Sequence, residues 1–157
     1  MRKIALLLAV IGLASPVWGA DPIIGTWKLN VSKSKFPQRE MAPKEVTDVY
    51  REAGTDQIEF IRKGTQSDGS PDSSTWTWPR VGGMAERKSP APLPAGTSYI
   101  ELLMDPGNWY VTILQNGRQN VAMHKVIAKD GKTMSITIKS TNAQGKPVEQ
   151  LQVFEKQ

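Results

Sequence analysis

Aromatic side chains are the residues of this chain whose types and spacing point most directly to chemistry. Trp76 and Trp78 are two residues apart, so in a strand they project from the same face. Two indoles on one face line an apolar pocket, stack on a flat ligand or a sugar, pack in a core, or contact a partner protein. Trp109 and Tyr110 are adjacent, which places one ring on each face of a strand. The candidate ligand-binding residues, all aromatic, are Tyr50, Trp76, Trp78, Tyr99, Trp109 and Tyr110.

Catalytic and metal chemistry is not predicted, because the residues that it requires are scarce. The sequence holds no cysteine and one histidine, His124. A zinc site needs three or four ligands, and a serine triad would have to recruit His124 beside a nucleophile elbow that no serine here occupies. For His124 an axial haem ligand is the alternative to a hydrogen-bonded strand residue. The sequence therefore predicts a protein that is not an enzyme and has no cofactor and no metal.

The first twenty residues have the pattern of a cleavable secretory signal. Arg2 and Lys3 supply a positive start, residues 4–13 are apolar, and the segment ends in small residues. The apolar run is too short to span a bilayer as a stable helix, and no later run reaches membrane length. We therefore predict a signal peptide at residues 1–20 and one exported domain at residues 21–157, periplasmic or secreted, with no integral membrane segment.

The charge pattern does not predict nucleic acid as a partner. Removal of Arg2 and Lys3 with the signal lowers the formal net charge from +5 to +3. The remaining basic residues are scattered, with no block and no interleaving with aromatic residues, so nucleic acid is not expected as a partner. Without cysteine there are no disulfides, and stability must come from core packing and strand pairing.

Regularly spaced turn signals predict the elements that position the aromatic residues. Asn116-Gly117 and Asp130-Gly131 supply the positive φ angles that tight hairpin turns require. Apolar residues alternate along the segments between turns, as in 133–140, and no helical crossover separates them. We expect nine or ten strands, nine of them at 24–30, 45–52, 56–63, 73–78, 98–104, 109–115, 121–129, 133–140 and 149–155.

Two segments lack this alternation. Residues 31–43 read as a long loop or a short 3₁₀ turn after the first strand. Residues 88–96 are too rich in proline to pair in a sheet, and we expect a loop over the rim of a barrel.

The first predicted strand carries Gly25 and Trp27, and this Gly-x-Trp resembles the opening of lipocalins and of the related fatty-acid-binding proteins. The resemblance implies that Trp27 closes the floor of a β-barrel and that Gly25 lets the backbone bend close beneath it. In lipocalins a basic residue stacks on the tryptophan. Here Lys139, Lys156 and Arg51 are the candidates for that position.

The C-terminal sequence extends the resemblance and also departs from it. Val153-Phe154-Glu155-Lys156 resembles the Val-Tyr-Glu-Lys ending of fatty-acid-binding proteins. Those proteins hold a ligand carboxylate with an Arg-x-Tyr, but the matching positions here are Gln152 and Phe154. A conventional fatty-acid clamp is therefore not expected. The helix-turn-helix lid of that family is also replaced, by the loop at 31–43.

Taken together, the patterns predict a single, all-β, antiparallel up-and-down β-barrel, similar to the small exported lipocalin-like, calycin-type proteins of bacteria. The function that the resemblance implies is non-covalent binding or carriage of a small hydrophobic or amphipathic ligand in the cell envelope. The alternative is an envelope interaction or structural module whose barrel interior is packed and holds no ligand. Inward-facing residues distinguish the two, because large side chains fill a barrel and small ones leave volume.

Overall fold

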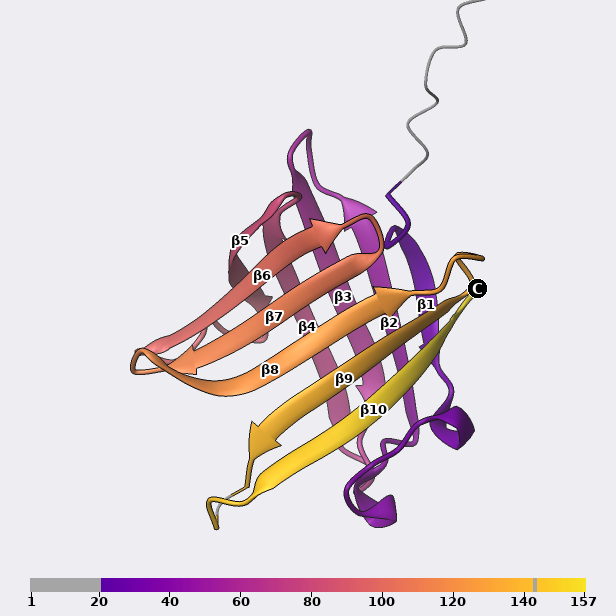
Figure 1. The fold of residues 1–157 in the computed structure, drawn as a ribbon, viewed down its shortest axis with the longest axis vertical. Coiled ribbons are helices and arrows are strands. Elements are labelled where there is room, and N and C mark those ends of the chain that lie inside the picture. The colour runs from indigo at the N-terminus through magenta and orange to yellow at the C-terminus, as the bar shows by residue number, and fades with distance from the viewer. Residues whose placement is uncertain (1–20, 143) are drawn as a thin grey trace, which may run out of the picture.

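A computed structural model describes residues 21–142 and 144–157 and shows an all-β protein (Figure 1). The predicted signal sequence lies outside the described residues and stays a prediction. The ten strands are β1 (Gly25–Leu29), β2 (Glu45–Glu52), β3 (Gln57–Thr65), β4 (Pro71–Pro79), β5 (Gly82–Ser89), β6 (Thr97–Asp105), β7 (Asn108–Gln115), β8 (Arg118–Ile127), β9 (Thr133–Thr141) and β10 (Pro147–Lys156).

The strands form one closed antiparallel barrel in which each pairs with the next along the chain. β1 closes the barrel by pairing with both β2 and β10, where Leu29 lies opposite Phe154. Tight turns make this meander possible: between β7 and β8, Asn116 and Gly117 both have positive φ, at 51° and 77°, as the twist of a hairpin requires. The predicted up-and-down barrel is confirmed.

One strand and one loop refine the sequence prediction. Gly82 and Gly83, which resemble a turn signal, instead begin β5, a strand that the sequence patterns did not identify. A Cβ added at Gly82 would lie 2.7 Å from the carbonyl oxygen of Glu101, so glycine lets β5 approach β6 closely. The loop after β1 contains two short 3₁₀ helices, η1 (Val31–Lys33) and η2 (Arg39–Met41), in agreement with the prediction for residues 31–43.

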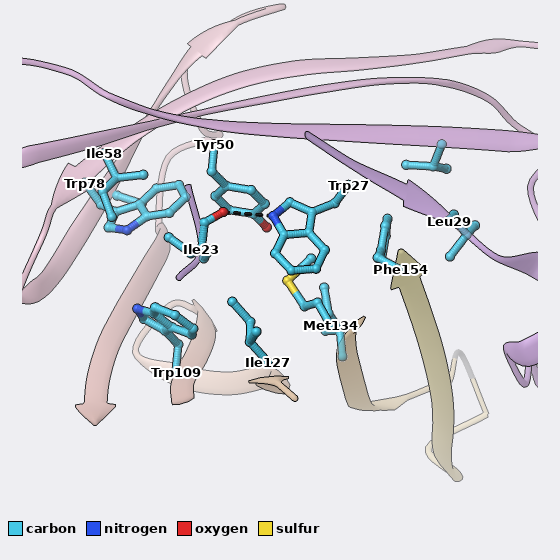
Figure 2. Packing of buried hydrophobic residues seen from close by; sticks show 13 residues of the cluster. Ile23, Trp27, Leu29, Tyr50, Ile58, Trp78, Trp109, Ile127, Met134 and Phe154 are labelled. Carbon is cyan, nitrogen blue, oxygen red and sulfur yellow. Dashed lines mark hydrogen bonds between the residues drawn. The ribbon is translucent and has the colours of Figure 1, made fainter. Parts of the chain in front are cut away.

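One end of the barrel, here called the closed end, is filled by buried side chains (Figure 2). Trp27 has no exposed surface, and its indole Nε1 donates a hydrogen bond of 2.8 Å to the carbonyl oxygen of Ile23. The chain before β1 thus folds under the barrel and is held there by Trp27. The other large residues of this cluster are Leu29, Ile58, Trp78, Trp109, Ile127, Met134 and Phe154.

The basic partner of Trp27 is Lys156. Its Nζ lies 5.1 Å from the centre of the Trp27 ring and donates to the carbonyl oxygen of Pro22 at 3.2 Å. Gly25 has a φ of +139°, and a Cβ there would come within 2.7 Å of Lys156 Cε. Glycine at this position therefore leaves the room through which the lysine reaches the ring. Of the other candidates, Arg51 pairs with Glu59, and Lys139 pairs with Glu149 on the barrel surface.

Candidate functional site

Beyond the closed end, the inward side chains leave a cavity of about 220 Å³ inside the barrel. This is smaller than the cavities of about 300 Å³ and more that drug-sized ligands occupy. Strands β7 to β9 supply an apolar wall of Ile113, Met123, Ile136 and Ile138. The facing strands supply four aromatic rings, those of Tyr50, Phe60, Trp76 and Tyr99. Polar side chains complete the lining, namely Arg62, Asp72, Ser74, Lys125 and Gln152.

The aromatic wall consists of two pairs of rings. Trp76 of β4 and Tyr99 of β6 have ring centroids 4.8 Å apart at an angle of 41°. Tyr50 and Phe60 lie opposite each other on β2 and β3, with centroids 4.9 Å apart. These tilted contacts hold the rings in place and leave their cavity-facing surfaces for a ligand to pack against.

A buried ion pair lies in the wall between the first strands. Arg62 of β3 faces Asp48 of β2 and donates two hydrogen bonds to its carboxylate, from Nε at 2.8 Å and Nη2 at 2.7 Å. The Asp48 side chain has no exposed surface, and that of Arg62 is 24% exposed. Burial by itself lowers the pKa of Arg62, but the Asp48 carboxylate beside it outweighs burial and raises the pKa above its usual range. The guanidinium is therefore a permanent cation whose charge is matched by Asp48.

A second buried ion pair joins β8 to β6 across the strand between them. Lys125 Nζ donates to Glu101 Oε1 at 2.9 Å, and the two side chains are 5% and 0% exposed. The same Nζ lies 5.2 Å from the ring centre of Trp78 and 5.5 Å from that of Tyr50, within the range of cation–π attraction. Glu101 Oε2 is buried without a hydrogen-bond partner, so only one of the two carboxylate oxygens accepts a hydrogen bond.

Burial sets the protonation of the phenols and of Glu101. It raises the pKa of Tyr50 and of Tyr99 well above the usual value for tyrosine, and nearby carboxylates raise both further. Both hydroxyls are therefore protonated and able to donate at neutral pH. Burial also raises the pKa of Glu101 above 4.5, although Lys125 opposes the shift.

The pH dependence of stability should reveal the buried state of Glu101. Because its folded pKa is raised above 4.5, its contribution to stability is fully present below that pH and is lost as pH rises through the folded pKa. We expect the unfolding free energy of Glu101→Gln, relative to wild type, to rise as pH increases above 4.5, by at most about 1.4 kcal/mol per pH unit. Urea unfolding at a series of pH values measures this difference.

Glu155→Gln is the control of opposite sign. Hydrogen bonds from Lys33 and Asn30 lower the pKa of Glu155 below 4.5, so its contribution is present above that pH and is lost on acidification. If the difference in unfolding free energy between variant and wild type changed with pH in the same direction for both variants, the raised pKa of Glu101 would be contradicted.

The structure separates the six predicted ligand-binding residues into three groups. Tyr50, Trp76 and Tyr99 line the cavity. Trp78 and Trp109 are buried in the closed end, where Trp78 makes an edge contact with Tyr50 (Figure 2). The sixth, Tyr110, lies on the outer surface.

The outward position of Tyr110 shows which ring of the Trp109-Tyr110 pair points into the barrel, namely that of Trp109. Tyr110 is 45% exposed and stacks on His124, with ring centroids 4.3 Å apart and an interplanar angle of 7°. His124 Nε2 lies 2.7 Å from Asn108 Oδ1. The histidine is thus a hydrogen-bonded strand residue on the outer face, and it does not face the cavity as a haem ligand inside the barrel would.

Sequence reasoning missed the two buried ion pairs beside the cavity. Asp48, Arg62, Glu101 and Lys125 all stand at inward positions of strands whose other inward residues are apolar or aromatic. For example, Lys125 stands between the inward Met123 and Ile127. A charged residue in a strand whose alternate residues are otherwise apolar is the sequence signal that could have identified them.

Residues 21–142 and 144–157 contain no group of three or more His, Cys, Asp or Glu side chains that could hold a metal ion. No helix within these residues is long and apolar enough to cross a membrane.

Comparison with known proteins finds similarity of structure only, since no protein-family model and no curated protein sequence matches this chain. The fluorescent protein UnaG superposes with a TM-score of 0.59 at 11% identity, covering 85% of this chain and 96% of its own. Zebrafish ileal bile acid-binding protein in complex with cholic acid gives 0.58 at 10% identity, with 87% and 99% covered. Protein Rv2717c of M. tuberculosis gives 0.51 at 16% identity, with 87% and 93% covered. The chain has the calycin-type barrel fold.

Proposed function

We propose that this protein binds a small amphipathic ligand inside its barrel. The observation that carries the proposal is the cavity of about 220 Å³, which opens beside the aromatic wall although the closed end is fully packed. A flat apolar body can pack between Trp76 and the aliphatic wall of β7 to β9, while its polar end meets the charged pairs. The cavity thus favours a ligand-binding barrel over the alternative of a module with a packed interior.

The size of the cavity limits the ligand. A dry cavity of about 150 Å³ holds a benzene molecule, so 220 Å³ suits a ligand of about ten non-hydrogen atoms. Cholic acid, found in the zebrafish neighbour, is much larger than this. The proposed ligand is therefore smaller than a bile acid.

The charges of the cavity favour a ligand whose polar end is neutral. The cations Arg62 and Lys125 are already paired with Asp48 and Glu101, and a further carboxylate, Asp72, lies in the lining. A ligand carboxylate would add a negative charge where acidic groups already outnumber basic ones, at a large desolvation cost. An alcohol, an amide or a carbonyl group avoids this cost.

We further propose that binding takes place after export, in the periplasm or outside the cell, and that the protein carries its ligand without transforming it. The signal-like pattern of residues 1–20 supports the location. The binding role in the name of the zebrafish neighbour supports carriage over catalysis, as does the position of the lone histidine outside the cavity. Under this proposal the chain is an exported protein similar to the lipocalin-like proteins of bacteria.

Native mass spectrometry of the protein isolated from its own host tests the proposal, together with calorimetric titration of the recombinant protein with cinnamyl alcohol, a flat ring with a neutral polar end. We expect a bound small molecule in the first experiment or one-to-one binding in the second. A protein without adduct that also binds none of a panel of small aromatic alcohols, amides and carbonyl compounds would contradict ligand binding.

Replacing Trp76 with alanine should weaken binding of cinnamyl alcohol by about tenfold, which corresponds to about 1.4 kcal/mol. The reason is that Trp76 offers the largest aromatic surface of the cavity lining. Calorimetric titration measures the dissociation constant. Tyr110→Ala is the matched control, because this ring lies on the outer surface and its loss should leave the constant unchanged. Equal effects of the two variants would place the binding site elsewhere.

A further inference from the structure

Lys125 is unusual among the lysines of this protein because it is buried. It is 4% exposed, whereas the other lysines of the described residues are exposed or, at Lys156, half-buried. Its side chain lines the cavity. The side chain therefore places a potential nucleophile, a primary amine, in the wall of the cavity.

Glu101 gives this amine a partner that can exchange a proton with it. Its Oε1 accepts from Lys125 Nζ at 2.9 Å, and its Oε2 has no partner. Because burial raises the pKa of Glu101, the carboxyl group can hold a proton that the ammonium group releases.

We propose that the cavity binds a small aldehyde and holds it as a reversible imine on Lys125, with Glu101 as the group that accepts and returns the proton. This inference rests on the proposed binding function and specifies the ligand class. The Trp78 and Tyr50 rings beside Nζ then stabilise the cationic form of the imine as they do the ammonium group.

The step balances without any further reactant. The Lys125 ammonium group passes a proton to Glu101, and the free amine forms a C–N bond to the carbonyl carbon as the π electrons move to oxygen. The oxygen of the resulting carbinolamine takes the proton held by Glu101 and a second one from the nitrogen. It leaves as water when the C=N bond forms. The nitrogen keeps the third proton of the original ammonium group, so the product is already the iminium cation opposite the Glu101 carboxylate, and the net change is aldehyde plus ammonium to iminium plus water.

The surrounding charges are compatible with this ligand class. Arg62 is held by Asp48 on the neighbouring strand and stays a cation. Imine formation leaves the charge of the Lys125–Glu101 pair unchanged, because one cation on nitrogen replaces another. A neutral aldehyde therefore adds no charge to the cavity, unlike a carboxylate, which would add a negative charge beside Asp72 and the two ion pairs.

Reductive trapping tests the inference. The wild-type protein is incubated with cinnamaldehyde and sodium cyanoborohydride, which reduces an imine to a stable secondary amine, and each modified lysine is located by peptide mass mapping. We expect a single adduct on Lys125 that forms about 100-fold faster than the average adduct on surface lysines, because the bound aldehyde is held next to the amine.

Lys125→Arg is the matched variant, because it keeps a cation opposite Glu101 but cannot form a stable imine. It should lose the adduct, whereas the wild-type protein should bind cinnamyl alcohol, which has no carbonyl group, without forming one. Adducts spread over surface lysines while the alcohol still binds would overturn the imine and leave the proposed binding function standing. If neither compound binds the wild-type protein, the imine is overturned and the binding proposal loses its support for this ligand class. The wild-type peptide map decides the matter even if the variant does not fold.

Discussion

Replacing Trp27 with alanine is expected to lower the free energy of unfolding by about 3–5 kcal/mol. The ring is fully buried in the closed end, and it holds the segment before β1 through its hydrogen bond to Ile23. Its loss leaves a cavity among Phe154 and the other buried residues of the closed end, and it removes the surface under Lys156. The large cost therefore combines lost burial, an empty volume and an unpaired carbonyl group.

Urea unfolding followed by far-ultraviolet circular dichroism measures this change. Trp76→Ala is the matched control, because the same ring is removed from a half-buried position that already borders a cavity. We expect its cost to be less than half that of Trp27→Ala. A cost for Trp27→Ala equal to or smaller than that of the control would show that Trp27 does not close the barrel.

The barrel could be predicted because its determinants are local. Asn116-Gly117 specifies a hairpin turn by backbone geometry alone, and the alternation of Met134 and Ile136 specifies a strand with one inward face. Strand β5 was missed because Gly82 and Gly83 carry the composition of a turn. Their actual role is close approach to β6, which only the three-dimensional arrangement shows.

Where both faces of a strand are apolar, the sequence could not predict which face points into the barrel. In β6, Tyr99 faces the interior, whereas Leu102 and Met104 are about half exposed, at 48% and 58%. In β7, Trp109 is buried and Tyr110 is exposed. Composition is the same for either orientation, and the choice depends on how the strand fits the closed barrel.

The two buried ion pairs depend on contacts that no local sequence pattern contains. Asp48 and Arg62 meet because β2 and β3 are in one particular register. Glu101 and Lys125 lie on strands that are not neighbours, and they meet across the inward surface of β7. A single sequence can show that these residues occupy inward positions, but the pairing follows from the closure of the barrel.

Replacing Arg62 with methionine is expected to lower the free energy of unfolding by about 3–5 kcal/mol, because it leaves the carboxylate of Asp48 buried without its cation. Asp48 has no exposed side-chain surface and receives both of its side-chain hydrogen bonds from Arg62. Asp48→Asn should cost less, because the Arg62 side chain is 24% exposed and its charge keeps some contact with water. Urea unfolding of both variants at neutral pH measures the two costs.

The double variant Asp48→Leu with Arg62→Met separates the cost of breaking the pair from the value of the pair itself. Apolar residues of similar volume remove both charges, and a buried ion pair replaced in this way changes stability by little or even favourably. We therefore expect the double variant to be more stable than Arg62→Met alone, and a strongly non-additive cycle. With Asp48→Leu measured as the second single variant, a double variant as unstable as the sum of the two single changes would show no coupling between the two residues and would contradict the ion pair. A double variant near wild type would mean that the pair's importance lies in the charge that it places in the cavity wall.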